Sequence, residues 1–479
     1  MANYKDIMKN KIIGRKQELT LLTEALVSNK SELVAIYGRR RVGKTFLIRE
    51  HYKNNFIYEV TGLTNGLLSD QLDNFTKELR IRTNNISIKT PRKWLEAFTL
   101  LEQYIDGLSY KNKKVIFIDE FPWIATPKSK FLMAFENFWN HYASRRNDLI
   151  IVICGSAASY MVNNIIKNKG GLHNRITKKI RLLPFNLNET ELFLKNNGIK
   201  YTQYDIIQLY MAIGGIPHYL ENLKKGDSVA QNIDRMCFDK DGLLNSEFSQ
   251  LFSSLFHDSK KHLALIYVLA SIRKGISRGE LIKKSKIESG GDFTLKLDEL
   301  IESGFVSEYS YYQNKRKLKL YRLSDEYSLF YLKFIRNNKV EGTGTWKKLF
   351  MSQSYKSWSG FSFETLCLKH VQQIKKGLRI DAIYSISSSW FNDSAQVDLL
   401  IDRDDNIINI CEMKFNKTSF TINKNYYNNL RNKITKFQQE TKSKKNVFLT
   451  MITTYGINHN KYSAEIVENE LTIESLFDD

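Results

Sequence analysis

A glycine-rich segment near the N-terminus constrains this sequence more than any other feature. Residues 38–45 match the pattern G-x-x-x-x-G-K-[ST] at every fixed position. The two glycines allow a tight turn whose backbone N–H groups point inward, which builds an anion cradle at the start of a helix. In this pattern the lysine reaches the outer phosphates and the threonine hydroxyl binds Mg²⁺. The predicted phosphate-binding residues are Gly38, Arg39, Arg40, Arg41, Val42, Gly43, Lys44 and Thr45.

The flanking sequence has the local structure that this loop requires. The apolar run 33–37 predicts a buried strand, and residues 46–52 predict the following helix. Strand, loop and helix in this order predict that the chain binds ATP with Mg²⁺. The three consecutive arginines in the loop either touch phosphates or face solvent, and the sequence leaves both alternatives open.

Two further strands end in polar residues suited to the same chemistry. The run 115–118 ends in Asp119 and Glu120, which predicts that Asp119 holds the Mg²⁺ shell and Glu120 polarises the attacking water. The run 149–154 ends in Gly155 and Ser156. Ser156 would sense the γ-phosphate, with a plain turn at the strand end as the alternative. Together these motifs predict an ATPase.

Length and composition limit the class of protein. A chain of 479 residues is too long for one hydrophobic core, and its hydrophobic fraction of 42% is that of a folded protein. We find no apolar stretch near the roughly 20 residues needed to span a bilayer, so we expect no membrane partner. The four cysteines are scattered without a C-x-x-C pair, which favours buried free thiols in a reducing cytoplasm.

The net charge of +21 favours a polyanionic partner, because basic residues release counterions when they bind nucleic acid. We therefore expect DNA as a partner. The alternative is that a lysine- and asparagine-rich chain is basic without binding anything.

The pattern along the chain predicts an α/β multidomain protein with four parts. Residues 1–185 alternate strands and helices, which predicts a parallel sheet around the phosphate-binding loop. Residues 186–255 are helical and predict a lid, broken at Gly214 and Gly215 before Pro217. Residues 256–340 predict a winged helix, and residues 341–479 predict a C-terminal α/β domain.

The winged-helix prediction rests on three helices followed by a hairpin. The helices are expected at 263–270, from the capping box at Ser277, and at 292–303, and the strands at 305–312 and 318–323 around the basic turn 313–317. The third helix would lie in the DNA major groove and the turn on phosphates. Because that helix carries acids, packing against protein is the open alternative. Residues 341–345 are expected to form a linker.

Acidic and basic residues gather on two predicted strands near the C-terminus. Asp398 lies in the first strand, and Glu412 and Lys414 share one face of the return strand, because side chains alternate along a strand. Two carboxylates and a lysine on one face predict a Mg²⁺-dependent nuclease site, in which Asp398 and Glu412 hold the metal and Lys414 orients the water. The alternative is a solvated edge of a hairpin.

This arrangement resembles the PD-(D/E)xK nuclease superfamily, through Asp398 and the run Glu412-Met413-Lys414. The resemblance implies a further catalytic glutamate on the first helix, for which Glu364 fits. It also implies a polar or basic residue on a later helix, with Lys433 and Gln438 as candidates. The proline that often begins the first motif is absent here.

The whole chain resembles prokaryotic AAA/STAND-type P-loop ATPases with a C-terminal winged helix and a nuclease-like domain. Residues 13–19 look like the N-terminal motif of that archaeal-type family, beside the adenine, and Gly215-Ile216-Pro217 looks like its G-x-P element. The resemblance implies that Pro217 packs near the base, that an arginine finger or a sensor residue lies at 171–175, and that ATP drives conformational switching.

Three functions remain open from the sequence. The first is an ATPase whose nucleotide state controls a Mg²⁺-dependent DNA endonuclease. The second is an ATP-dependent switch or scaffold whose C-terminal domain binds nucleic acid or protein without cutting. The third is a motor that assembles into a homo-oligomeric ring on ATP binding and takes an arginine from its neighbour, with Arg145, Arg146 and Arg175 as candidates.

Overall fold

The computed structural model describes residues 12–109, 112–126, 128–157, 160–166, 172, 174–256, 258–272, 274–312, 318–336 and 344–478. The chain divides into two compact units, residues 1–183 and residues 184–479. Some predicted features lie outside the described residues: the basic turn 313–317, positions 171 and 173 of the arginine-finger segment, and positions 341–343 of the linker.

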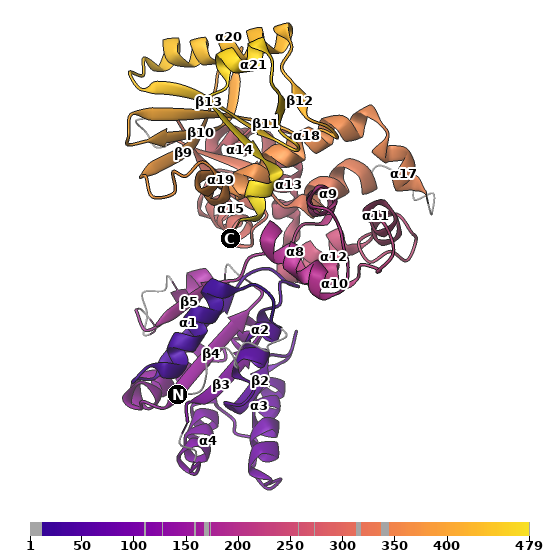
Figure 1. The fold of residues 1–479 in the computed structure, drawn as a ribbon. Coiled ribbons are helices and arrows are strands. Elements are labelled where there is room, and N and C mark those ends of the chain that lie inside the picture. The colour runs from indigo at the N-terminus through magenta and orange to yellow at the C-terminus, as the bar shows by residue number, and fades with distance from the viewer. Residues whose placement is uncertain are drawn as a thin grey trace. The chain divides into compact units, whose positions relative to one another are not determined.

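The first unit is built on a five-stranded sheet in the order β2-β3-β4-β1-β5, with every neighbouring pair parallel (Figure 1). The strands are β1 (Glu32–Tyr37), β2 (Phe56–Thr61), β3 (Lys114–Asp119), β4 (Leu149–Gly155) and β5 (Lys178–Arg181). The α-helices are α1 (Lys16–Val27), α2 (Lys44–Tyr52), α3 (Leu68–Thr83), α4 (Trp94–Asp106), α5 (Phe121–Ile124) and α6 (Phe131–His141). The carboxyl ends of all five strands meet at one edge, where open α/β sheets bind ligands.

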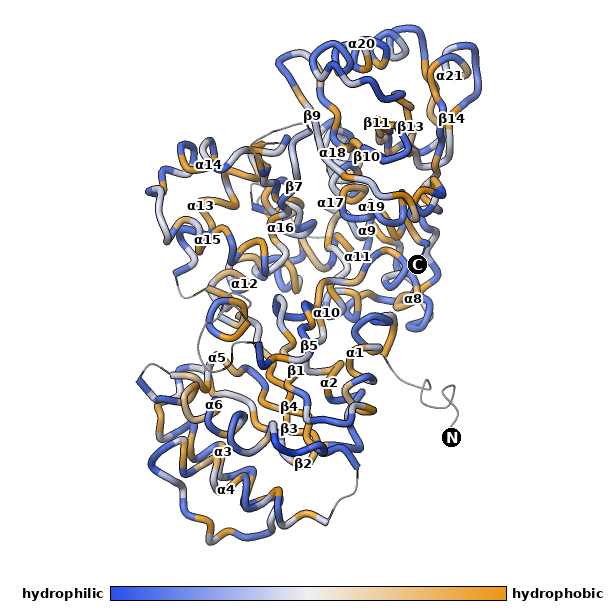
Figure 2. Tube along the Cα trace, turned by 90° about the vertical axis from the view of Figure 1, so that its left-hand side faces the viewer, coloured by the Kyte–Doolittle hydropathy of each residue, from blue (hydrophilic) through white to orange (hydrophobic). Residues whose placement is uncertain are grey.

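The core of this unit lies on both faces of the sheet. Every residue of β3 and β4 is buried, and only Tyr37 of β1 is partly exposed. Figure 2 shows these strands in orange, the colour of hydrophobic residues. Parallel strands that are covered on both faces need continuous apolar runs. Phe131 and Phe135 of α6 pack against Phe98 of α4 in this core.

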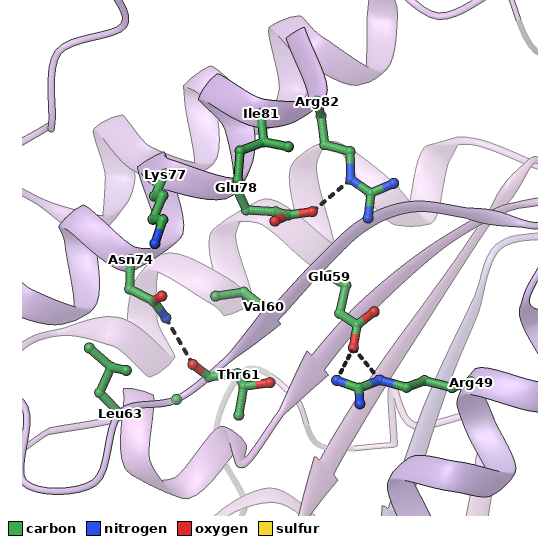
Figure 3. A pocket seen from close by; sticks show the side chains of 11 residues that line it. Arg49, Glu59, Val60, Thr61, Leu63, Asn74, Lys77, Glu78, Ile81 and Arg82 are labelled. Atoms are coloured by element: carbon green, nitrogen blue, oxygen red, sulfur yellow. Dashed lines mark hydrogen bonds and ion pairs between the residues drawn. The ribbon is translucent and has the colours of Figure 1, made fainter. Parts of the chain in front are cut away.

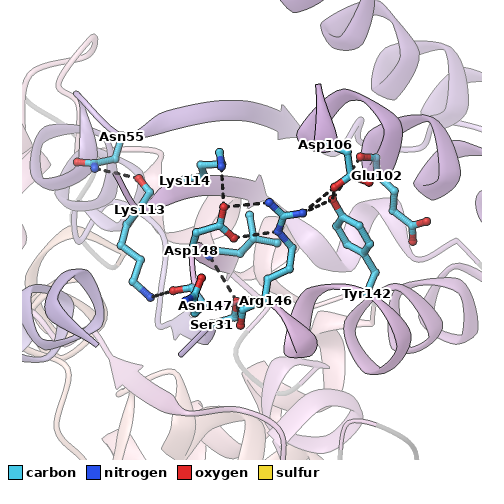
Figure 4. Close-up of polar contacts among 11 residues, drawn as sticks. Ser31, Asn55, Glu102, Asp106, Lys113, Lys114, Tyr142, Arg146, Asn147 and Asp148 are labelled. Carbon is cyan, nitrogen blue, oxygen red and sulfur yellow. Dashed lines mark hydrogen bonds and ion pairs between the residues drawn. The ribbon is translucent and has the colours of Figure 1, made fainter. Parts of the chain in front are cut away.

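Ion pairs close the amino-terminal edge of the same sheet. Asp148, just before β4, accepts hydrogen bonds from Lys114 Nζ at 2.6 Å and from two nitrogens of Arg146 at 2.8 and 3.0 Å (Figure 4). Arg146 also contacts Asp106 at 2.6 Å. Arg146, a candidate arginine finger, is therefore held in an ion-pair network at the edge opposite the phosphate-binding loop.

The second unit combines a helical part with a large mixed sheet. Its α-helices are α8 (Leu187–Asn196), α9 (Gln203–Ile213), α10 (Pro217–Glu221), α11 (Val229–Cys237), α12 (Glu247–Leu255), α13 (Ser259–Ala270), α14 (Arg278–Ser285), α15 (Gly291–Glu302), α16 (Glu326–Phe330), α17 (Thr345–Phe350), α18 (Gln353–Lys369), α19 (Val371–Gly377), α20 (Lys424–Thr441) and α21 (Lys461–Ile466). The three helices expected between 263 and 303 are present, and the capping box at Ser277 is confirmed.

The hairpin expected after those helices is part of the C-terminal sheet. The eight strands run in the order β15-β13-β11-β10-β9-β7-β8-β6. They are β6 (Ile276–Ser277), β7 (Val306–Tyr311), β8 (Lys319–Leu323), β9 (Ser385–Phe391), β10 (Gln396–Arg403), β11 (Ile407–Lys414), β13 (Asn446–Thr453) and β15 (Asn469–Thr472), while β12 (Phe420–Thr421) and β14 (Ile457–Asn458) form a separate pair. Two residue pairs, Ser310 with Ser388 and Tyr311 with Ser389, join β7 to β9.

The long helix α20 covers one face of this sheet. Its Leu430 and Phe437 are buried in a cluster with Trp390 of β9 and Leu400 of β10. The rest of α20 is polar, and Figure 2 draws much of it in blue. Among the described residues, no helix combines the length and apolar character that crossing a membrane requires.

Candidate functional sites

The phosphate-binding loop needs both of its glycines for its shape. Gly38 has φ 143°, and a Cβ there would lie 2.3 Å from the backbone oxygen of Leu182. Gly43 has φ 88° and is the residue before the first turn of α2. Both conformations are in the region that favours glycine, so the loop leads from β1 into α2 as the sequence pattern predicts.

Lys44 is buried inside the loop that it follows. Its Nζ donates hydrogen bonds to the backbone oxygens of Gly38 and Arg39, both at 2.9 Å. Burial lowers the pKa of Lys44, although the nearby acids Glu120 and Asp119 oppose that shift. A phosphate oxygen is a charged acceptor, so it would replace these neutral carbonyls as the favoured partner of the ammonium group.

The strands bring the predicted magnesium residues together. Thr45 Oγ1 donates a hydrogen bond of 2.8 Å to Asp119 Oδ2. Thr45 lies at the start of α2, which follows β1, and Asp119 ends β3, on the other side of β4. A hydroxyl and a carboxylate in contact are oxygen ligands of the kind Mg²⁺ takes alongside water and substrate phosphates. The donor chemistry therefore fits a magnesium ion at this place.

Glu120 lies beside that pair and is held by Ser156. The Glu120 backbone has φ 45°, an unusual value for a residue with a side chain. Its Oε2 accepts hydrogen bonds from the Ser156 hydroxyl at 2.9 Å and from the Ser156 backbone N–H at 3.3 Å. Ser156 thus contacts the predicted water-activating acid directly.

The remaining loop residues take three different environments. Arg39 is 1% exposed, so it does not face solvent, whereas Arg40 does; the phosphate contacts of both stay predictions. Arg41 is half-buried with φ 71°, and Val42 is buried. Only Arg40 therefore presents its side chain freely on the loop surface.

Arg15 supports the loop from the preceding segment. Its Nη2 donates to the Val42 backbone oxygen at 3.1 Å, and its Nη1 donates to the Leu183 backbone oxygen at 2.7 Å. Arg15 is 5% exposed. Sequence reasoning noted the motif 13–19 but missed this contact, which fixes the loop to the end of the first unit.

Pro217 belongs to the second unit, where it is buried and begins α10. Gly215 just before it is required by packing, because a Cβ there would lie 2.0 Å from the Phe185 backbone oxygen. The contact of Pro217 with a nucleotide base stays a prediction.

A further pocket of the first unit lies at the edge strand β2 (Figure 3). It has a volume of about 480 Å³ between the carboxyl half of β2 and the helices α2 and α3. Its lining includes two internal ion pairs of 2.6 Å, Arg49 with Glu59 and Arg82 with Glu78. These paired charges give the pocket no strong preference for a charged ligand.

In the second unit the strands place the predicted acids opposite each other. Leu399 of β10 pairs with Cys411 of β11 in antiparallel register, so the next positions, Asp398 and Glu412, lie side by side. The pairing of β10 with β9 shifts between Val397 and Leu400, and such bulges re-aim side chains. The expected burial of Cys411 and Met413 on the other face is confirmed.

The negative charge of Asp398 is balanced by an arginine from the β7–β8 hairpin. Arg322 of β8 donates from Nη2 to Asp398 Oδ1 at 2.9 Å, and Gln396 Nε2 donates to the same oxygen at 2.8 Å. Arg322 is 4% exposed. Sequence reasoning missed Arg322, because 76 positions separate it from Asp398.

The negative charge of Glu412 is balanced by two lysines. Lys433 of α20 lies 2.6 Å from its Oε2, Lys414 lies 2.9 Å from its Oε1, and the Tyr426 hydroxyl donates to Oε1 at 2.5 Å. Burial opposes ionisation of Glu412, but the two lysines outweigh it and lower the pKa of the carboxyl to about 2. Glu412 is therefore a charged, ion-paired group.

Glu364 of α18 joins the cluster in a different state. Burial and the negative charge of Asp398 raise the pKa of Glu364 to about 7, against the opposing charge of Arg322. The helix thus brings a third acid to the strand face, as the resemblance implied. Of the two later-helix candidates, Lys433 contacts the cluster.

The basic partners decide what this cluster can hold. Within the described ranges, no group of three or more histidine, cysteine, aspartate or glutamate side chains is placed to bind a metal ion. Asp398 and Glu412 instead share three basic side chains, and a metal ion would have to displace them. In this conformation the residues do not fit a magnesium ion.

The comparisons with known proteins agree with the first site. Residues 12–223 match the family model described as an ATPase domain predominantly from Archaea. Residues 331–427 match a family of archaeal and bacterial proteins of unknown function. Together with the loop geometry, the first match supports ATP binding and hydrolysis by an archaeal-type P-loop ATPase domain.

Two proteins of Methanocaldococcus jannaschii are similar in sequence. An uncharacterized protein is 25% identical over 81% of this chain and 83% of its own length. An uncharacterized ATP-binding protein is 47% identical over 9% of this chain and 76% of its own length.

Among solved structures, a Walker-type ATPase of Pyrococcus abyssi matches with a TM-score of 0.48 and 17% identity, over 66% of this chain and 95% of its own. The Cdc6p protein of Pyrobaculum aerophilum matches with a TM-score of 0.32 and 15% identity, over 72% of this chain and 98% of its own.

Proposed function

We propose that the chain is an ATP-hydrolysing switch, and that its nucleotide state controls a nucleic-acid-binding second unit. The contact between Thr45 and Asp119 carries the first half of the proposal, because it joins the two predicted magnesium ligands from the start of α2 and the end of β3. A bound Mg²⁺ would neutralise charge on the phosphates there. Lys44 would bind the outer phosphates, and Glu120 would orient the attacking water.

Ser156 would act on the timing of hydrolysis. Ser156 donates to one carboxylate oxygen of Glu120 through both its hydroxyl and its backbone N–H, which fixes the orientation of that carboxylate. When the γ-phosphate offers Ser156 a stronger acceptor, the serine would turn toward it and release Glu120. This is the γ-phosphate sensing predicted for Ser156.

The test of the first half is an ATPase assay on three proteins. Wild type should release phosphate in the presence of Mg²⁺, whereas Lys44→Ala should lose both nucleotide binding and hydrolysis. Ser156→Ala should keep nucleotide binding. Equal phosphate release from wild type and Lys44→Ala would reject the loop as the catalytic site.

The second half rests on charge and on the paired acids. Residues 424–445, which include α20, contain seven lysines or arginines and one glutamate: Lys424, Arg431, Lys433, Lys436, Lys442, Lys444, Lys445 and Glu440. A basic segment of this kind, made of α20 and the residues after it, suits the phosphates of DNA. With Asp398 and Glu412 both ion-paired, we propose that the unit binds DNA without cutting it in this conformation.

A Mg²⁺-dependent DNA endonuclease is the second candidate. The observation in its favour is that Glu364, Asp398, Glu412 and Lys414 converge as the resemblance implied. Incubation with Mg²⁺ or Mn²⁺ and single-stranded, duplex and branched DNA, with and without ATP, separates the two candidates. Cleavage that disappears in Glu412→Ala would establish the nuclease, and intact DNA throughout would support binding alone.

Two further properties belong to the proposal. We propose a cytoplasmic location, supported by four buried cysteines that are all free thiols. We also propose that ATP binding drives homo-oligomer assembly. Light scattering with and without a non-hydrolysable ATP analogue tests the assembly, and an unchanged mass would contradict it.

A further inference from the structure

One buried amide side chain in the first unit reaches two separate backbone segments. Gln71 lies in α3 and is 1% exposed. Its Oε1 accepts a hydrogen bond from the Leu63 backbone N–H at 3.1 Å, and its Nε2 donates to the Leu63 backbone oxygen at 2.7 Å. The same Nε2 donates to the Trp123 backbone oxygen at 3.2 Å. Gln71 therefore joins the segment after β2 to the segment after β3.

Both segments lie directly against the backbone of the acid predicted to activate water. The Gly62 backbone N–H donates to the Asp119 backbone oxygen at 2.9 Å, and a Cβ at Gly62 would lie 2.6 Å from the Glu120 backbone oxygen. On the other segment, the Trp123 backbone N–H donates to the same Glu120 oxygen at 2.8 Å. Gln71 thus holds the two neighbours of the turn at Glu120.

The backbone of Glu120 needs such support. Its φ of 45° and ψ of 46° are in the left-handed region, where a side chain crowds its own backbone. A residue stays in that region only when the surrounding structure holds it there. Ser156 holds the carboxylate end of Glu120, whereas the segments bound by Gln71 hold its backbone end. The two supports act on different parts of one residue.

We propose that Gln71 is a positioning residue for ATP hydrolysis, because it keeps the turn at Glu120 in the left-handed conformation and so aims the Glu120 carboxylate. The inference rests on the proposed role of Glu120. The three hydrogen bonds of Gln71 go to backbone atoms outside the phosphate-binding loop. A shift of about 1 Å in a catalytic group is enough to slow a reaction strongly. Loss of these bonds should therefore lower kcat and leave the KM for ATP unchanged.

Phosphate release by the full-length protein tests this expectation with Gln71→Met, which keeps the length of the side chain and removes its hydrogen bonds. We expect kcat to fall at least tenfold, with a KM for ATP within twofold of wild type. Asn74→Leu is the matched control, one turn further along α3. Asn74 Nδ2 donates to the Thr61 backbone oxygen at 2.8 Å, so its loss leaves the Gln71 contacts in place and should keep the wild-type kcat (Figure 3). An equal fall in both variants would overturn the proposal.

A second comparison separates positioning of Glu120 from a general loss of folded protein. If Gln71 acts through Glu120, then Gln71→Met should change the residual rate of Glu120→Gln by less than twofold. A variant that merely folds poorly would lose activity by the same factor in both backgrounds. A further tenfold loss in the Glu120→Gln background would contradict the proposal, because the two residues would then act independently.

Amide hydrogen exchange without nucleotide tests the same contacts in the absence of turnover. Peptides covering residues 60–66 and 119–126 should exchange at least fivefold faster in Gln71→Met than in Asn74→Leu. Equal exchange in the two variants would reject the positioning role. Failure of the proposed function has a different signature, which is equal phosphate release from wild type and Lys44→Ala whatever the exchange result.

Discussion

The two acidic centres of this chain differ in the partners that hold their carboxylates. In the first unit, Asp119 accepts from the Thr45 hydroxyl and Glu120 accepts from Ser156. In the second unit, Asp398 is paired with Arg322 and Glu412 with two lysines. Neutral partners leave a carboxylate its charge for a metal ion, whereas basic partners neutralise it. Two pairs of acids carried by neighbouring elements of a sheet therefore differ in function because their partners differ in charge.

The largest expected effect is at Glu120. Glu120→Gln keeps the size and hydrogen-bonding capacity of the side chain but removes the base, so we expect ATP hydrolysis to fall by about 10²–10⁴-fold while ATP binding is retained. Phosphate release and binding of a fluorescent ATP analogue measure the two quantities. A rate within a few-fold of wild type would mean that the first centre is no more catalytic than the second.

The next effect is on the stability of the second unit. Glu412→Gln leaves the half-buried Lys414 and Lys433 without their counter-charge, which should cost more than breaking an exposed pair and less than the about 3–5 kcal/mol of a fully buried one. Urea unfolding followed by tryptophan fluorescence measures this loss. As a matched control, Glu78→Gln breaks the exposed pair with Arg82, which should cost about 0–1 kcal/mol. Equal losses of unfolding free energy in the two variants would contradict the claim that the ion pairs of Glu412 contribute more than the exposed pair of Glu78.

Removing the basic partners should reduce the difference between the two acidic centres. The double variant Arg322→Gln/Lys433→Ala leaves Asp398 without its cation and Glu412 with Lys414 alone, so the second centre should then come closer to the first. We expect nucleotide-free protein to gain at least tenfold in Mn²⁺ affinity over wild type, as measured by titration calorimetry. If wild type already binds Mn²⁺ as tightly at Glu412, the basic side chains do not exclude the metal.

Acid should also act on the two units through different histidines. Burial lowers the pKa of His370 to about 4, and its Nε2 accepts from the Leu187 backbone N–H at 3.2 Å. Because the unfolded chain binds this proton near pH 6.5, stability is full above that value and lost as pH falls toward 4, by roughly 3 kcal/mol. In the first unit, burial also lowers the pKa of the half-buried His51, whereas His141 is exposed, so the first unit should show the same kind of effect at a different histidine.

Calorimetric unfolding between pH 7 and pH 4 checks this effect. Glu364, with its raised pKa, stabilises the second unit as pH falls and opposes His370, so the test compares the two proteins: on going from pH 7 to pH 4 the transition temperature of His370→Asn should fall less, or rise more, than that of wild type. An unchanged slope in the variant would show that another group is responsible.

The sequence predicts the first site better than the second for a physical reason. Lys44 and Thr45 belong to a local motif, and parallel strands bring Asp119 and Ser156 to the same edge whenever such a sheet forms. The partner of Asp398, in contrast, depends on the short pairing of β7 with β9, which no local pattern encodes. The hydrogen bonds of Arg15 were missed because they run to backbone oxygens, which leave no trace in residue type.

The most direct test of the account combines DNA binding and DNA integrity in one experiment. Labelled duplex DNA is titrated with wild type and Lys44→Ala, with Mg²⁺ and with or without ATP, and the DNA is then run on a denaturing gel. We predict that ATP changes the affinity of wild type at least tenfold, leaves Lys44→Ala unchanged, and that the DNA stays intact. Cut DNA, or the same response to ATP in both proteins, would contradict the account.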